Sequence, residues 1–150
     1  MAYSRLALFA AACLVVGGCS TDRALAPRLI SLDGATLRLE ASLWRDFQPI
    51  SPPDGKPLIA GLRITTVDGA PIPSTLRADS VWIYNEAAVW AASVREEQPR
   101  SAGAPFFEVV ARNGPKWGPG IEVDVVVQVR DAAGRAFLLQ APRVFIGRTD

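Results

Sequence analysis

Residues 121–130 read IEVDVVVQVR and contain the clearest structural signal in the chain. Ile121, Val123, Val125, Val127 and Val129 fall on one face of an extended segment, opposite a mainly polar face. Apolar side chains at a period of two, all five of them β-branched, predict a half-buried β-strand and are incompatible with a helix. Residues 131–134 (DAAG) supply a turn, and residues 136–146 return, so the segment predicts a β-hairpin.

Similar segments extend from this hairpin towards the amino terminus. Gly, Pro, Asp and Asn separate them, and no segment has a convincing amphipathic helical pattern. Residues 87–94 are rich in alanine, so one or two helical turns remain an alternative there. With the hairpin, the predicted strands number about seven; the other five cover residues 35–44, 58–67, 80–84, 87–94 and 106–112.

Short strands separated by turns are typical of an all-β domain with two packed antiparallel sheets. Their number and spacing resemble those of immunoglobulin-type and fibronectin-type β-sandwiches. The resemblance implies a two-sheet antiparallel β-sandwich over residues 34–150. The disulfide that often pins such domains is absent, because both cysteines lie near the start of the chain. The fold class by itself implies no function.

The first 18 residues have the composition of a secretory signal peptide. Arg5 precedes an apolar run over residues 6–16, and small residues follow it. The run is too short to span a bilayer, which needs roughly 20 apolar residues. A buried helix is a poor alternative, because the run is apolar on all sides.

Val16-Gly17-Gly18-Cys19 ends this segment and resembles the lipobox of bacterial lipoproteins, although Leu is more usual at the first position. The resemblance implies cleavage between Gly18 and Cys19, and attachment of diacylglyceryl and acyl chains such as palmitate to Cys19. Two lipid chains give stable membrane anchoring. Ser20, where inner-membrane lipoproteins typically have Asp, implies the outer membrane, facing the periplasm unless the protein is flipped outward to the cell surface. Residues 19–33 are then a lipidated tether.

The composition argues against several function classes. A formal net charge of +1 lacks the basic excess of a nucleic-acid binder. The chain has no histidine, which excludes histidine-based hydrolysis and histidine-ligated metals. Cys13 would leave with the signal peptide, and no nucleotide-binding motif is present. We therefore expect no enzyme activity, no cofactor and no metal.

The remaining candidates are two carboxylates and the tryptophans. Glu122 and Asp124 share a strand face and could chelate a cation or act as an acid/base pair, but a solvated outer face explains them better. We expect Trp82, in the middle of a strand, to lie in the core. Trp90 and Trp117 form the candidate binding surface, with Trp117 either a lid over the domain or a contact residue.

These observations predict a membrane-anchored envelope lipoprotein whose non-catalytic domain binds or scaffolds another envelope component. An alternative is an inhibitor or accessory subunit of an envelope enzyme that acts through the proline-rich residues 49–57, between Pro49 and Pro57. A rigid loop with outward side chains favours that alternative. A third hypothesis is a hydrolase that uses Glu122 and Asp124.

Overall fold

The computed structural model describes residues 25–150, and the predictions for the signal peptide, the lipobox and Ser20 lie outside these residues. The described chain is all-β and contains no α-helix. Its eight strands are β1 (Leu29–Leu32), β2 (Ala35–Asp46), β3 (Leu58–Thr66), β4 (Arg77–Asn85), β5 (Ala88–Ser93), β6 (Phe106–Gly114), β7 (Glu122–Arg130) and β8 (Ala136–Thr149).

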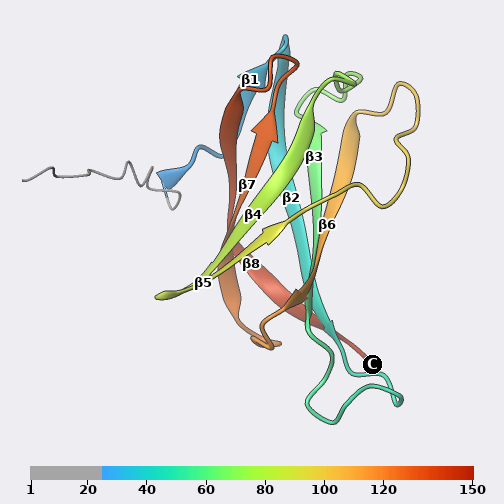
Figure 1. The fold of residues 1–150 in the computed structure, drawn as a ribbon, viewed down its shortest axis with the longest axis vertical. Coiled ribbons are helices and arrows are strands. Elements are labelled where there is room, and N and C mark those ends of the chain that lie inside the picture. Colours follow the sequence, from blue (N-terminus) through green and yellow to red (C-terminus); the bar gives the residue numbers. More distant parts are fainter. Residues whose placement is uncertain (1–24) are drawn as a thin grey trace, which may run out of the picture.

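The strands form one mixed sheet in the order β5-β4-β7-β8-β2-β3-β6, with β1 paired to β2. The sheet curls so that its two ends approach each other (Figure 1). Just beyond β5, Arg95 bridges to Val110 of β6, and the Val110 N–H donates to the Arg95 carbonyl at 3.0 Å. The predicted all-β class is therefore confirmed, but the strands are not divided into two separate sheets.

Strand β8 joins the two halves because it is long and bent. Its first part pairs antiparallel with β7, and its last residues pair parallel with β2. The register shifts between Val123 and Val125 of β7, opposite Arg143, which has a positive φ of 54°. An extra residue of this kind bends a strand, which lets β8 leave one neighbour and reach the other.

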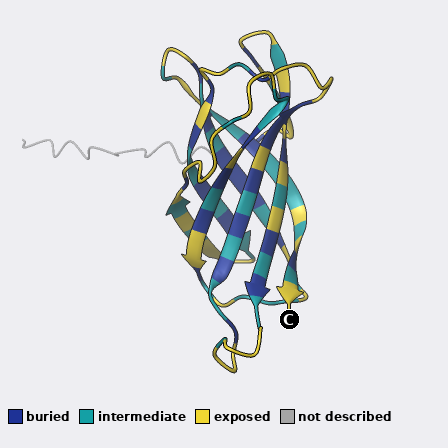
Figure 2. Ribbon diagram, turned by 90° about the vertical axis from the view of Figure 1, so that its right-hand side faces the viewer, coloured by how far each residue is buried: buried dark blue, intermediate teal, exposed yellow. Residues whose placement is uncertain are grey.

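The core lies inside the curl. Buried and exposed residues alternate along the strands, as Figure 2 shows, because successive side chains point to opposite faces. The inward positions of β7 that the sequence predicts are confirmed as buried from Val123 to Val129. The largest fully buried side chains include Phe107, Leu37, Leu58, Leu62, Ile64, Leu76, Ile83, Leu139 and Ile146.

All seven predicted strands are present, including β5, for which helical turns were the alternative. Its six residues pair with β4 from Ser80 to Asn85, so tertiary pairing overrides the helical preference of alanine. Strand β1 is an eighth strand that the sequence analysis missed. It lies within residues 19–33, the predicted tether, and its four residues are too few to show a period.

The prediction that Trp82 lies in the core is wrong. Its neighbours Val81 and Ile83 are fully buried and face the core, whereas Trp82 is half-buried on the opposite face of β4. The alternation of a strand decides this, because one residue of register moves a side chain to the other face. The strand was identified correctly, but the residues whose side chains face inward from it were not.

The two ends of the molecule carry different loops. Residues 49–57 project at the end where β2 finishes and β3 begins, near the carboxyl terminus (Figure 1). Strand β1 and residues 67–76 lie at the other end (Figure 1). The chain enters beside β8, where the Gln140 N–H donates to the Pro27 carbonyl at 2.8 Å.

Candidate functional site

The loop over residues 49–57, here called the proline loop, is the most prominent projection of the described chain. Ile50 is 87% exposed, and Pro52 and Pro53 are exposed beside it. A single exposed aliphatic side chain is common on protein surfaces, but here Ile50 and the two prolines together form a small apolar surface on one loop.

The base of this loop is held by Arg45, the last inward-facing residue of β2. Arg45 is only 3% exposed and donates to carbonyl oxygens of two loops. Its Nε reaches the Lys56 carbonyl at 3.0 Å, and its Nη2 donates to that of Asp54. Its Nη1 reaches the carbonyls of Gly118 at 2.7 Å and Lys116 at 3.2 Å.

These bonds explain how a buried guanidinium is tolerated. A buried charge is costly unless hydrogen bonds replace its lost hydration. The planar guanidinium has five N–H donors in a fixed fork, so it satisfies four carbonyls of irregular backbone at once. Arg45 therefore joins the proline loop to the loop over residues 115–121.

A glycine and an aromatic ring complete the base. Gly55 has a positive φ of 76° and lies against the ring of Phe47, where a Cβ atom would come within 2.5 Å of a ring carbon. The same ring lies under the guanidinium groups of Arg148, at 4.1 Å, and Arg45, at 5.0 Å. Only glycine fits this position without moving the ring.

An ion pair ties the tip of the loop to its neighbour. Lys116 Nζ lies 2.7 Å from the Asp54 carboxylate. The hydrogen bond from Lys116 lowers the pKa of Asp54, and desolvation opposes this in part. At the other side, the Gln48 N–H and then Lys56 lower the pKa of Asp46. The loop therefore stays fixed at its base while Ile50 remains displayed.

The two tryptophans of the predicted binding surface are not part of the proline loop, although Trp117 belongs to the neighbouring loop that Arg45 joins to it. Trp90 and Trp117 are half-buried and pack against the core. Trp90 covers Gly114 of β6, where a Cβ would meet its ring at 2.5 Å. Arg45 binds the carbonyls on either side of Trp117, which favours the lid over the displayed alternative. A partner contact by either residue stays a prediction.

The paired carboxylates of β7 are both engaged by Arg143. Asp124 accepts from the Arg143 N–H at 2.8 Å, and Glu122 lies 3.1 Å from its Nε. They therefore stabilise the bend of β8. Within residues 25–150, no group of three or more His, Cys, Asp and Glu side chains lies close enough to hold a metal ion.

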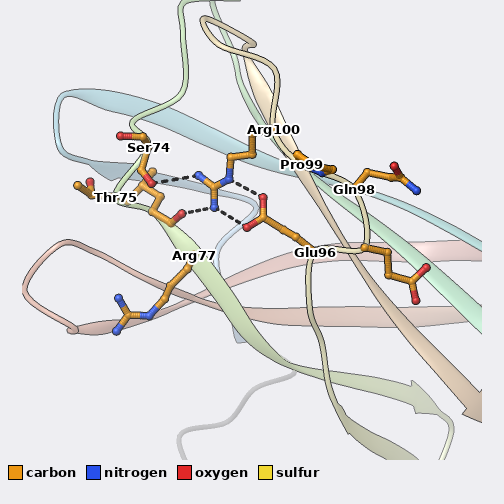
Figure 3. Close-up of a pocket in the computed structure, with 9 residues that line it drawn as sticks. Ser74, Thr75, Arg77, Glu96, Gln98, Pro99 and Arg100 are labelled. Atoms are coloured by element: carbon orange, nitrogen blue, oxygen red, sulfur yellow. Dashed lines mark hydrogen bonds and ion pairs between the residues drawn. The ribbon is translucent and has the colours of Figure 1, made fainter.

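A second candidate site is a surface pocket at the other end of the sheet, between residues 74–77 and 96–100. Its volume is about 680 Å³, and Arg100 crosses it (Figure 3). The guanidinium of Arg100 binds the carbonyls of Ser74 and Leu76 and the carboxylate of Glu96, and it lies 3.9 Å above the Phe107 ring. Because its polar groups bond to one another, this opening is a weaker candidate than the proline loop.

Sequence reasoning identified the proline loop but missed Arg45 and Ile50. A signal for Arg45 was present, since it continues the inward series of Leu37, Leu39, Ala41 and Leu43 by one period. A charged residue at an inward position predicts buried polar partners. No sequence signal marks Ile50, because its exposure depends on the path of the loop.

In the part of the chain that the structure describes, no helix is long and apolar enough to cross a membrane. Comparisons with protein-family models, with curated proteins and with solved structures find no match to this chain. Its function is therefore inferred from its own residues.

Proposed function

We propose that this chain is an exported lipoprotein, anchored through lipid on Cys19, whose β-domain binds another envelope protein through the proline loop. The observation that supports binding is the 87% exposure of Ile50 on a loop whose base Arg45 holds. A loop that is already ordered loses little conformational entropy when it docks. An inhibitor or accessory subunit of an envelope enzyme would use the same loop in the same way.

The anchor is supported by the leader and by the distance from Cys19 to the domain. Leu29, where β1 begins, lies ten positions after Cys19. A fully extended chain of that length spans about 35 Å at most. Strand β1 would therefore stay within that distance of the bilayer, and the proline loop lies at the opposite end of the sheet from β1 (Figure 1).

Intact-mass analysis and membrane fractionation of the wild type and Cys19→Ala test the anchor. We expect the wild type to lose residues 1–18, gain the mass of its lipid chains and sediment with membranes. The variant stays uncleaved and without lipid. Two soluble proteins cleaved at the same place would contradict the proposal. The fraction that holds the wild type, inner or outer membrane, tests the role of Ser20.

Photo-crosslinking from within the loop tests the contact surface. In one variant a photoreactive residue replaces Ile50. In the control variant it replaces Val89 of β5, which is 50% exposed and lies on another part of the sheet. We expect one discrete adduct with an envelope protein from position 50, abolished by an added Pro52→Asp substitution. Equal adducts from both positions, or none from position 50, would contradict docking through this loop.

The curled sheet, we further propose, is an immunoglobulin-type β-sandwich bridged by β8. Support comes from the pairing: β1, β2, β3 and β6 form one antiparallel set, and β4, β5, β7 and β8 form another. An experimental structure tests this. Two face-to-face layers about 10 Å apart would support the sandwich, and an evenly curved wall would contradict it.

A further inference from the structure

The outer face of β2, β3 and β6 carries a groove that the proline loop does not use. Its volume is about 420 Å³, within the range of small-ligand sites, about 300–1,000 Å³. It is centred on Gly61 and lined by side chains from all three strands. Strand registers place these side chains in cross-strand rows.

Gly61 creates the hollow. It is the middle residue of a row whose other members are Ser42 and Val110. Its φ is not in the left-handed region, so no turn geometry requires glycine at this position. Glycine inside a strand weakens the strand and often marks a bulge or a site where another group approaches the backbone closely. Here it leaves room above β3, and the edge of the Trp44 ring occupies part of that room.

Trp44 forms one wall of the groove. It is the next outward residue of β2, and its ring lies diagonally over Gly61, with Cζ3 3.4 Å from where a Cβ would be. The ring is half-buried. The part of the ring nearest to Gly61 is its Cζ3–Cη2 edge, so an apolar surface borders the hollow.

The opposite wall is a charged row of Glu40, Arg63 and Glu108. Arg63 Nη2 lies 2.6 Å from Glu108, and Arg38 lies 2.8 Å from Glu40, so the charges of this wall cancel. The carboxylates and guanidinium remain about half exposed and keep free donor and acceptor capacity. The wall therefore suits an uncharged ligand with many hydroxyl groups.

We propose that this groove binds a saccharide, with one pyranose ring stacked on Trp44 over Gly61. The apolar C–H face of a pyranose matches the indole face, and its hydroxyls match the acceptors of Glu40 and Glu108 and the donors of Arg63. A charged ligand would leave one member of the neutralised row without its partner. The site lies on another face from the proline loop and does not depend on the lipid on Cys19.

Isothermal titration calorimetry of the full chain in detergent micelles tests the proposal. The probes are tetrasaccharides of N-acetylglucosamine, glucose and xylose, with a mixed-charge tetrapeptide as the competing ligand class. We expect at least one saccharide to bind the wild type and the peptide not to bind. We expect Trp44→Ala to weaken saccharide binding about tenfold or more. Trp82→Ala, another outward tryptophan on a different part of the sheet, is the matched control and retains wild-type affinity.

Gly61→Val separates binding from folding. Valine favours strands, but its Cβ would lie 3.4 Å from the Trp44 ring and its methyl groups extend beyond the Cβ, so thermal unfolding is measured beside binding to show that the variant is folded. Its side chain fills the hollow, so we expect binding to weaken about tenfold or more. Failure of all three saccharides to bind the wild type would overturn the proposal. So would wild-type affinity in both groove variants, or equal loss in Trp82→Ala.

Discussion

An arginine fastens the loops at each end of the sheet, but the two arginines have different surroundings. At the proline-loop end, Arg45 is 3% exposed and binds only backbone carbonyls. At the other end, Arg100 binds two carbonyls and the carboxylate of Glu96, with its side chain 19% exposed. Both guanidinium groups also lie over a phenylalanine ring, Phe47 and Phe107 respectively.

The difference lies in what remains if the arginine is lost. Removing Arg45 leaves carbonyls of two loops unpaired where water has limited access, and no carboxylate shares the bond network. Removing Arg100 leaves two carbonyls unpaired rather than four, and Glu96, which is one third exposed, is free to be hydrated. A buried group left without its partner costs more than an exposed ion pair contributes. Arg45 therefore fixes its loops more firmly, which suits a docking surface.

The largest effect is expected for Arg45→Met. Methionine replaces the volume but supplies no donor, so the free energy of unfolding should fall by about 3 kcal/mol. For a chain of this size the unfolding temperature should fall by roughly 6–12 °C, measured by calorimetry. A loss no larger than that of Arg100→Met would contradict the comparison.

Gly55→Ala tests the packing beneath the proline loop. The positive φ and the close approach of Phe47 both oppose a side chain, so we expect a loss of about 2 kcal/mol in denaturant unfolding. The matched control is Gly69→Ala at the other end, with a similar φ of 77° but no atom within 4 Å. The control should lose about 1 kcal/mol, from the backbone alone. Equal losses would show that the contact with Phe47 contributes nothing.

Arg100→Met should lower the free energy of unfolding by about 1 kcal/mol, because its ion pair with Glu96 is partly solvated. Salt screens such pairs, so the difference from the wild type should shrink in 1 M salt. The loss of unfolding free energy in Arg45→Met should not shrink in salt, because the hydrogen bonds of Arg45 involve no carboxylate. Denaturant titrations at two salt concentrations distinguish the two arginines.

The smallest effect concerns the exposed pair of Asp54 and Lys116. Because this pair lowers the pKa of Asp54, it stabilises the folded chain above the ordinary pKa of 3.8. That contribution is lost as the pH falls through the lowered pKa. The difference in denaturation midpoint between the wild type and Asp54→Asn should therefore be present at pH 7 and decrease below pH 3.8. If the difference in denaturation midpoint did not change with pH, contacts other than this ion pair would account for it.

Much of the fold was predictable because strand alternation is a local property. The β-branched series of β7 predicts its own inward face, and the Asp-Gly and proline signals place the turns. The proline loop was identified for the same reason. Trp82 was misplaced because it was assigned to the core by residue type, whereas the register of β4 turns it outward. Strand β1 was missed because four residues show no period.

The sequence by itself determined the all-β class, the seven main strands and the prediction of a lipidated leader, because each depends on residues adjacent in the chain. Only the tertiary structure decided that Arg45 meets Lys116 and Gly118, that Trp44 lies over Gly61, and that β8 joins both halves of the sheet. These contacts bring together residues far apart in sequence or on neighbouring strands. They depend on which strands become neighbours and in which register, and no local pattern encodes that choice.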